Sequence, residues 1–119
     1  KIVQDGGNKM ATLSQQGDTN KANMIQSGGS IQTATVTQSG NRNDVQTLTQ
    51  SGNSQIAVLT QTGSDNLITN LTQTGASHNA NMTQTGDWNS ATLTQSAGVS
   101  SSHVSIQAGN YNTLNVAQN

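Results

Sequence analysis

The sequence contains no cysteine, proline or phenylalanine, and it carries little charge. Without cysteine, disulfides and thiolate metal sites are both excluded. Only 29% of the residues are hydrophobic, so a large apolar core is not available. No apolar run approaches the ~20 residues that a membrane helix needs, and we expect no membrane insertion. Disordered chains this poor in apolar residues are usually highly charged and rich in proline. Charged residues make up only 8% here, so permanent disorder is not expected.

Several functional classes lack support in the sequence. The net charge of −1 gives no electrostatic reason to expect nucleic acid as a partner. No nucleophile–base arrangement and no phosphate-binding glycine pattern is present, so we predict a non-enzymatic protein without a cofactor. His78 and His103 lie in related strands, but zinc normally takes three or four protein ligands. We therefore predict no metal site.

What the chain does contain is a regular succession of glutamine residues. Glutamine recurs every 11 or 12 residues from Gln4 to Gln118. Glycine stands two residues after most of these glutamines, which is a turn signal. The predicted turn glycines are Gly17, Gly28, Gly40, Gly52, Gly63, Gly75, Gly86 and Gly109.

Between the turns the residues alternate, as they do in the segment 84–95. Asn89, Ala91, Leu93 and Gln95 would point one way, and the intervening serine and threonines the other way. This period of two indicates a strand. In nine of ten units the residue two before the closing glutamine is aliphatic or methionine. Each unit is therefore predicted to be a turn followed by a strand with one partly apolar face.

One such unit cannot bury its apolar face alone, but two units facing each other can. We predict an all-β, two-sided β-solenoid, a single domain over residues 1–119 that stacks into a cross-β fibre. Its five rungs would span approximately 4–26, 26–50, 50–73, 73–95 and 95–118. Stacked rungs lie ~4.8 Å apart, so that glutamine stacks on glutamine. An unpaired buried amide costs about 1–3 kcal/mol, and stacking supplies the partner.

Two units depart from this pattern. Between Gln38 and Gln50 the residue four before the closing glutamine is Gln46, and Val45 falls on the outward side, so a bulge is expected there. Between Gln95 and Gln107 the aliphatic residues are one residue out of phase. An extra turn residue at Ala97 and a missing residue before Gln107 would explain this, and we expect that rung to be the least regular.

The unit Gln-x-Gly-x-x-Asn-x-Ala-x-x-x-Gln, seen at Gln84–Gln95 and nearly so at Gln15–Gln26, resembles the repeat of the curli major subunit family. The resemblance implies a secreted bacterial amyloid of the biofilm matrix, exported through an outer-membrane pore and seeded by a minor nucleator subunit. It also implies self-assembly through stacked amides. The stacking residues are Gln15, Asn20, Gln26, Gln38, Gln50, Gln61, Gln73, Gln84, Asn89, Gln95, Gln107, Asn112 and Gln118.

Two pairs of residues at the predicted turns, one aromatic and one acidic, have more than one possible role. Trp88 and Tyr111 are expected in neighbouring rungs of one column, either as a solvent-facing stack or as a patch that binds surfaces. Asp65 and Asp87 are expected close together in one row of turns, where their repulsion would delay folding before export.

Alternative functions are an ice-binding monomer with outward threonine ladders, or a rigid stalk of a larger adhesin. Because Lys1 begins in mid-pattern, we expect a longer precursor.

Overall fold

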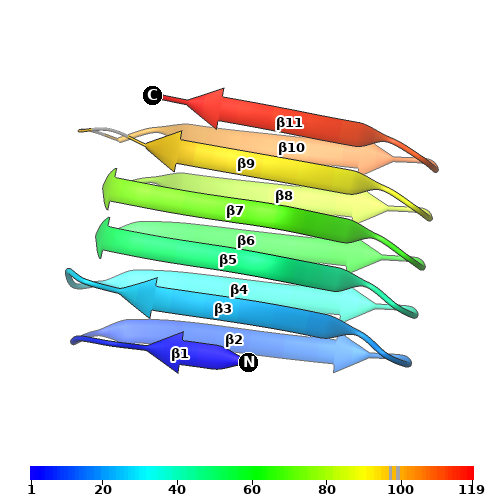
Figure 1. The fold of residues 1–119 in the computed structure, drawn as a ribbon, viewed down its shortest axis with the longest axis horizontal. Coiled ribbons are helices and arrows are strands. Elements are labelled where there is room, and N and C mark those ends of the chain that lie inside the picture. Colours follow the sequence, from blue (N-terminus) through cyan, green and yellow to red (C-terminus); the bar gives the residue numbers. More distant parts are fainter. Residues whose placement is uncertain (97, 99) are drawn as a thin grey trace.

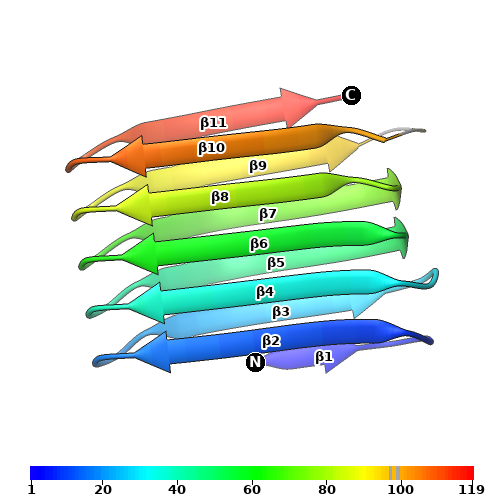
Figure 2. The same ribbon diagram turned by 180° about the vertical axis from the view of Figure 1, so that it is seen from behind.

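Alternating polar and apolar residues produce eleven parallel-paired strands in the computed structural model, which describes residues 1–96, 98 and 100–119. Strands alternate between two stacked sheets, one with six strands and one with five (Figures 1 and 2). The strands are β1 (Ile2–Gln4), β2 (Lys9–Gln16), β3 (Lys21–Ser27), β4 (Gln32–Ser39), β5 (Asp44–Asn53), β6 (Gln55–Thr62), β7 (Leu67–Ala76), β8 (Asn79–Thr85), β9 (Ser90–Ser96), β10 (Ser102–Ala108) and β11 (Thr113–Gln118).

The two sheets have the order β1-β3-β5-β7-β9-β11 and β10-β8-β6-β4-β2. Each strand is therefore hydrogen-bonded to the strand one full turn away along the chain. The prediction of an all-β, two-sided solenoid of about five turns is thus confirmed. Within the described residues, no helix is long and apolar enough to cross a membrane.

The core is a thin layer of aliphatic side chains between the sheets. Leu59, Leu71 and Leu93 have no exposed surface, and Met82 is 1% exposed. In the five-stranded sheet the registered column Leu13, Val36, Leu59 and Met82 supplies the large side chains, beside a column of alanines. Because small and large columns alternate, a small number of hydrophobic residues forms one buried core between the sheets.

A bulge lies in β5, as the sequence predicts, but the predicted direction of Val45 is wrong. The register shifts between Ala22 and Met24 of β3, which pair with Val45 and Leu48 of β5. The extra residue lets both Val45 and Leu48 point inward, and both are fully buried. Gln46 takes the exposed position instead. A bulge inserts one unpaired residue, so the alternation restarts after it.

A second bulge, which the sequence analysis did not predict, lies in β7. Ile68 and Leu71 are both fully buried although they are three residues apart. The two bulged strands pair with each other in register, Val45 with Ile68 and Leu48 with Leu71. The register shifts again where β7 meets β9. The bulges therefore form a matched pair in the middle of the six-stranded sheet.

The predicted missing residue before Gln107 is also wrong. Strand β10 pairs with β8 without interruption from Ser102 to Ala108, which places Ser105 opposite Met82 and Gln107 opposite Gln84. Val104 and Ile106 consequently face outward and are 66% and 73% exposed. The glutamine column stabilises this register, because Gln107 Oε1 accepts a hydrogen bond from Gln84 Nε2 at 2.8 Å. The predicted extra turn residue, Ala97, lies outside the described residues.

Candidate functional site

Two columns of stacked glutamines run along the solenoid axis, one in each sheet. In the five-stranded sheet the column is Gln15, Gln38, Gln61, Gln84 and Gln107. In the six-stranded sheet it is Gln4, Gln26, Gln50, Gln73, Gln95 and Gln118. Each column contains a continuous chain of side-chain amide bonds, with nitrogen–oxygen distances from 2.6 to 2.9 Å. We call these two columns the glutamine ladders.

All ladder amides except those of Gln4 and Gln15 also donate a hydrogen bond to the opposite sheet. Gln61 Nε2, for example, donates to Gln84 Oε1 at 2.9 Å and to the backbone oxygen of Asp44 at 3.4 Å. Gln73 Nε2 donates to Gln95 Oε1 and to the backbone oxygen of Ile56, both at 2.9 Å. Both N–H groups of these buried amides are thereby satisfied, so the glutamines can be fully buried without an unpaired donor. The ladders therefore hold the rungs together along the axis and the sheets together across it.

The glutamine ladders have a direction. Every amide nitrogen donates to the oxygen of the next rung toward the C-terminus, from Gln15 to Gln38 at one end and from Gln84 to Gln107 at the other. Consequently the C-terminal rung ends on the nitrogens of Gln107 and Gln118. The N-terminal rung ends on the oxygens of Gln4 and Gln15. The two ends of the rod are therefore chemically complementary.

A third column, of asparagines, lies at the turns that follow the five-stranded sheet. Its members are Asn20, Asn43, Asn66, Asn89 and Asn112. Asn66 and Asn89 illustrate its bonding, because the backbone nitrogen and Nδ2 of Asn89 both donate to Asn66 Oδ1 at 3.1 Å. Asn89 Nδ2 also donates to the backbone oxygen of Gly109 at 2.8 Å. We call this column the asparagine ladder.

The repeat motif in the sequence indicates only part of the asparagine ladder. Asn20, Asn89 and Asn112 fit the motif, whereas Asn43 and Asn66 do not, although both are fully buried. The bulges in β5 and β7 place these two residues seven rather than six positions before the closing glutamine, so they did not fit the motif. A constant spacing of 23 residues from Asn20 to Asn112 is the signal that identifies all five.

Five turn glycines stand where a side chain would collide with the backbone of the next rung: Gly17, Gly40, Gly52, Gly63 and Gly86. A Cβ added to Gly40 would lie only 2.0 Å from the backbone oxygen of Gly63, and a Cβ on Gly63 would lie 2.1 Å from the oxygen of Gly86. Their φ angles of 109° also favour glycine. All eight predicted turn glycines have a positive φ: Gly17, Gly28, Gly40, Gly52, Gly63, Gly75, Gly86 and Gly109.

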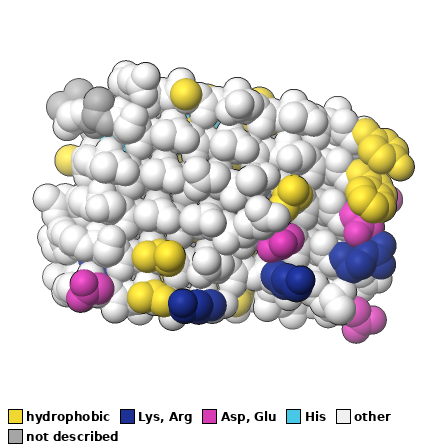
Figure 3. All heavy atoms as spheres, in the orientation of Figure 1, with side chains coloured by type: hydrophobic (Ala, Val, Ile, Leu, Met, Phe, Trp, Pro, Cys, Tyr) yellow, Lys and Arg dark blue, Asp and Glu magenta, His cyan; other side chains and the backbone are white. Residues whose placement is uncertain are grey.

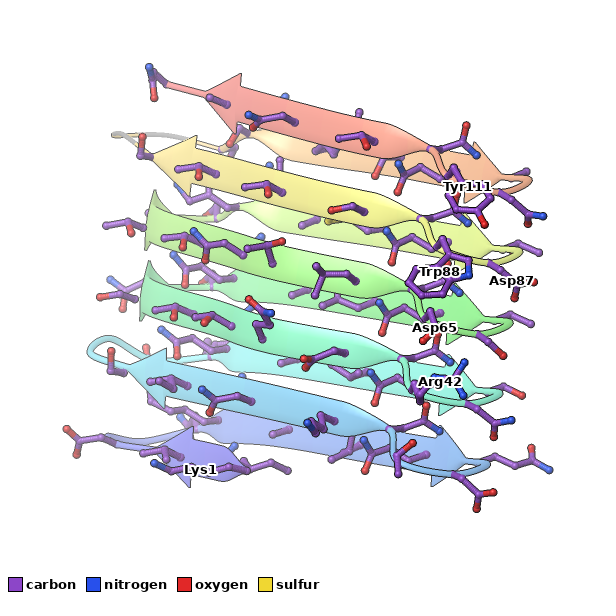
Figure 4. The ribbon with its side chains drawn as sticks, turned by 45° about the vertical axis from the view of Figure 1, so that its right-hand side comes forward. Lys1, Arg42, Asp65, Asp87, Trp88 and Tyr111 are labelled. Atoms are coloured by element: carbon purple, nitrogen blue, oxygen red, sulfur yellow. The ribbon has the colours of Figure 1, made fainter. Side chains whose placement is uncertain are left out.

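Charged and aromatic side chains line the exposed edge formed by these turns (Figure 4). Arg42 donates to Asp65 through Nε at 2.7 Å and through a terminal nitrogen at 2.5 Å. These hydrogen bonds hold the pKa of Asp65 below its usual range, with the attraction of the opposite charge adding to them and burial opposing them. Trp88 and Tyr111 stack in adjacent rungs, with ring centroids 6.3 Å apart and ring planes 7° from parallel.

Asp65 and Asp87 each have a favourable partner in the structure. Asp87 Oδ1 accepts a hydrogen bond from the backbone nitrogen of Ser64 at 2.7 Å, while Asp65 is paired with Arg42. The backbone nitrogen of Trp88 donates to the oxygen of Ser64, which aligns Asp87 with Ser64 rather than with Asp65. A repulsion between the two carboxylates would therefore be opposed by the ion pair of Asp65 with Arg42 and by the hydrogen bond from Ser64 to Asp87.

The two histidines lie in different columns. His78 Nε2 lies 2.9 Å from the backbone oxygen of Thr74, and its Nδ1 lies 2.7 Å from Ser101 Oγ. His103 instead pairs with Ala80. Within the described part of the chain, no three side chains of histidine, cysteine, aspartate or glutamate come together as metal ligands would.

The outer surface is mostly polar and uncharged, as the face of the six-stranded sheet shows (Figure 3). The ladders and the turns are therefore the candidate functional features of this molecule.

Neither the curated proteins nor the solved structures contain a match to this chain. Residues 69–96 match the family model described as Curlin associated repeat. This segment includes Gln73, Gln84 and Gln95 of the glutamine ladders, together with β8 and β9. The chain therefore carries a curlin associated repeat, in agreement with the resemblance that its glutamine spacing indicates.

Proposed function

We propose that this chain is the structural subunit of an extracellular, curli-like fibre that supports a bacterial biofilm matrix and mediates adhesion. In this proposal the subunits join end to end, and each adds its rungs to the same two sheets. The match to the curlin associated repeat supports the kind of fibre. By the same resemblance, the partners are other copies of the chain, a minor nucleator subunit and an outer-membrane secretion pore.

The observation that carries the proposal is the complementarity of the two rod ends. The C-terminal end offers amide nitrogens of Gln107 and Gln118, whereas the N-terminal end offers the amide oxygen of Gln15. A groove of about 440 Å³, lined by His103, Ser105 and Leu114 among others, lies between β10 and β11 at the C-terminal end. Open strand edges expose backbone donors and acceptors that favour pairing with another chain. End-to-end contact would satisfy the backbone and side-chain groups together.

Fibre formation tests this proposal. We expect the chain, diluted from denaturant and left to stand, to form unbranched fibres in electron micrographs. Their X-ray diffraction should show the reflections of ~4.8 Å along the fibre axis and ~10 Å between sheets that cross-β structure gives. A solution that remains monomeric under these conditions would contradict the proposal.

The ice-binding alternative requires two uninterrupted threonine rows on one face. In the five-stranded sheet Thr35 pairs with Val58, and Asn81 and Val104 follow in the same column. This column is therefore not a threonine ladder. A measurement of thermal hysteresis on the monomer separates the two functions, because only an ice-binding protein depresses the freezing point without depressing the melting point.

A further inference from the structure

The two sheets do not contain the same number of strands, and this determines how a second copy can be added. One sheet has six strands, with β1 and β11 at its ends, and the other has five, with β2 and β10 at its ends. Along the axis the strands alternate between the sheets, so that β11 is the last strand at one end and β1 is the first at the other (Figure 1). A continuous solenoid therefore needs a strand on β10 next, and only then a strand on β11.

Strand β2 of a second copy fits the open edge of β10. Continuing the register of the five-stranded sheet places Gln15 of the second copy on Gln107, as Gln107 is placed on Gln84. The chain then places β3 of the second copy on β11. This continues the asparagine ladder from Asn112 to Asn20 and the glutamine ladder from Gln118 to Gln26.

In this arrangement β1 of the second copy and β11 of the first copy require the same place. Strand β1 pairs with β3 through Ile2–Met24, Val3–Ile25 and Gln4–Gln26. Gln4 Nε2 donates to Gln26 Oε1 at 2.7 Å, the acceptor that Gln118 of the first copy needs. The amino group of Lys1 donates to the backbone oxygen of Ala22 at 2.6 Å on the same edge. Strand β1 thus occupies on β3 the position that the last residues of β11 of the first copy would take.

Strand β1 is short and exposed, so a longer strand can compete with it for the edge of β3. It has three residues, all of them exposed, with Ile2 at 42% and Val3 at 38%. The linker to β2 contains Gly6 and Gly7, which allow it to move as a hinge. Strand β11 has six residues and would cover more of the β3 edge, including Ala22 at its start.

The other possible junction keeps β1 in place and pairs it with β11. Because β1 and β2 are consecutive strands of alternating sheets, this junction would leave one empty strand position between β10 and β2 of the second copy. The facing edges of β10 and β2 would then be enclosed without partners for their backbone N–H and C=O groups. Buried backbone groups are almost always paired, so this junction is disfavoured.

We propose that β1 is a plug: it occupies the edge of β3 that β11 of a second copy must bind, and the subunit can accept a neighbour only after β1 has left. This inference rests on the proposed end-to-end assembly. It predicts that every new junction begins with the release of β1, so that the occupancy of the β3 edge by β1 controls the rate of growth.

A reversible crosslink between β1 and β3 tests the plug. The chain has no cysteine, so Val3→Cys with Ile25→Cys introduces a single possible disulfide. Both residues are registered partners on the outward face. Paired strands place such residues ~4.8 Å apart, within the ~4.4–6.8 Å between Cα atoms that disulfides span. We expect the reduced variant to form fibres and the oxidised variant to form none. Added in small proportion to the unmodified chain, the oxidised variant can join a fibre only through its own β10 and β11, so it should stop growth at N-terminal fibre ends.

The matched control joins Thr12→Cys to Thr35→Cys, which are registered partners of β2 and β4 at the same end of the rod. The fibre keeps this pairing, so its oxidised and reduced forms should elongate at the same rate. Oxidised Val3→Cys with Ile25→Cys elongating as fast as its reduced form would overturn the plug. Circular dichroism of both oxidised variants checks that each one folds.

A substitution that releases β1 gives the opposite test. Val3→Pro removes a backbone donor from β1 and disfavours its pairing. We expect its lag time to be several-fold shorter than that of the unmodified chain, and an unchanged or longer lag would overturn the plug. Failure of the unmodified chain to form any fibre would instead contradict the proposed function, and the plug with it.

Discussion

At the residue scale, the buried amide is the unit of this structure. Gln50 and Gln73 have no exposed surface, yet each one donates both along its ladder and to the opposite sheet. An amide without partners would oppose folding by about 1–3 kcal/mol, so such a residue is tolerated only where the next rung repeats it. The sequence spacing predicts which glutamines share a column. It could not reveal the bonds to the opposite sheet, because these depend on how the two sheets are offset.

The ion pair between Arg42 and Asp65 predicts a pH dependence. Hydrogen bonds from Arg42 lower the pKa of Asp65 in the folded chain below its ordinary value of about 3.9. The contribution of Asp65 to stability is therefore present above that ordinary value and is lost as the pH falls through the lower, folded pKa. We expect Asp65→Asn to be less stable than the unmodified chain in urea at neutral pH. The two chains should become equal in strong acid, and a difference that persists there would contradict this role.

The pair Asp65 and Asp87 predicts a second effect, on the rate of assembly. If their repulsion delays folding, the double variant Asp65→Asn with Asp87→Asn should assemble faster at neutral pH and low salt. Added salt should reduce the difference, because it screens exposed charges. Asp65→Asn alone also loses the contact with Arg42, so Asp87→Asn alone is the cleaner comparison. Assembly of the double variant at the unmodified rate in low salt would leave both residues as turn formers only.

At the scale of the element, the turns are more strained than their sequences indicate. Each turn that carries the asparagine ladder contains both a glycine and a non-glycine residue of positive φ, such as Arg42 at 56°, Asp65 at 59° and Trp88 at 61°. Turn signals predict the glycine, but no sequence rule selects Trp88 or Tyr111 for a left-handed conformation. In the structure the backbone nitrogens of these two residues donate to the preceding rung, Trp88 N to Ser64 O at 3.1 Å and Tyr111 N to Asp87 O at 3.0 Å. The bulge in β7 was not predicted because Leu67, Thr69 and Leu71 keep the period of two before Gln73. Only the register shows that Ile68, and not Thr69, points inward.

The glycine column predicts a clear difference between two substitutions. Gly63→Ala would bring its Cβ to 2.1 Å from the backbone oxygen of Gly86, whereas Gly7→Ala would meet nothing within 4 Å. Alanine at a positive φ destabilises by more than about 1 kcal/mol, before any displacement of the next rung. We expect urea unfolding to show this loss for Gly63→Ala and a change within about 0.5 kcal/mol for Gly7→Ala. Equal losses would contradict the close approach of these turns.

The register of β10 predicts that its aliphatic residues contribute little to stability. Ile106 is 73% exposed, so Ile106→Thr should change the free energy of unfolding by less than about 0.5 kcal/mol. Leu93→Ala, at a fully buried position of the neighbouring sheet, should destabilise by about 2–5 kcal/mol. A comparable loss for Ile106→Thr would instead favour the out-of-phase register expected from the sequence alone. Urea unfolding of the two variants decides between these registers.

At the scale of the whole molecule, the solenoid has two unlike ends and a direction. The N-terminal rung presents β1 and β2, and the C-terminal rung presents β10 and β11. The repeat of 11 or 12 residues was sufficient to predict the two sheets, their parallel stacking and the glutamine ladders. The direction of the amide bonds and the odd number of strands could not be predicted. The spacing places each glutamine in its column, but it does not decide which way the side-chain amide is turned.

The central claim is that subunits join end to end through the glutamine ladders, and Gln15 tests it most directly. Gln15→Ala removes the oxygen that would accept a hydrogen bond from Gln107 of the preceding copy, together with the donor to Gln38. Thr35→Ala, an outward position in β4, is the matched control. The lag time of fibre formation should be several-fold longer for Gln15→Ala and nearly unchanged for Thr35→Ala. Equal lag times for the two variants would contradict assembly through the ladders.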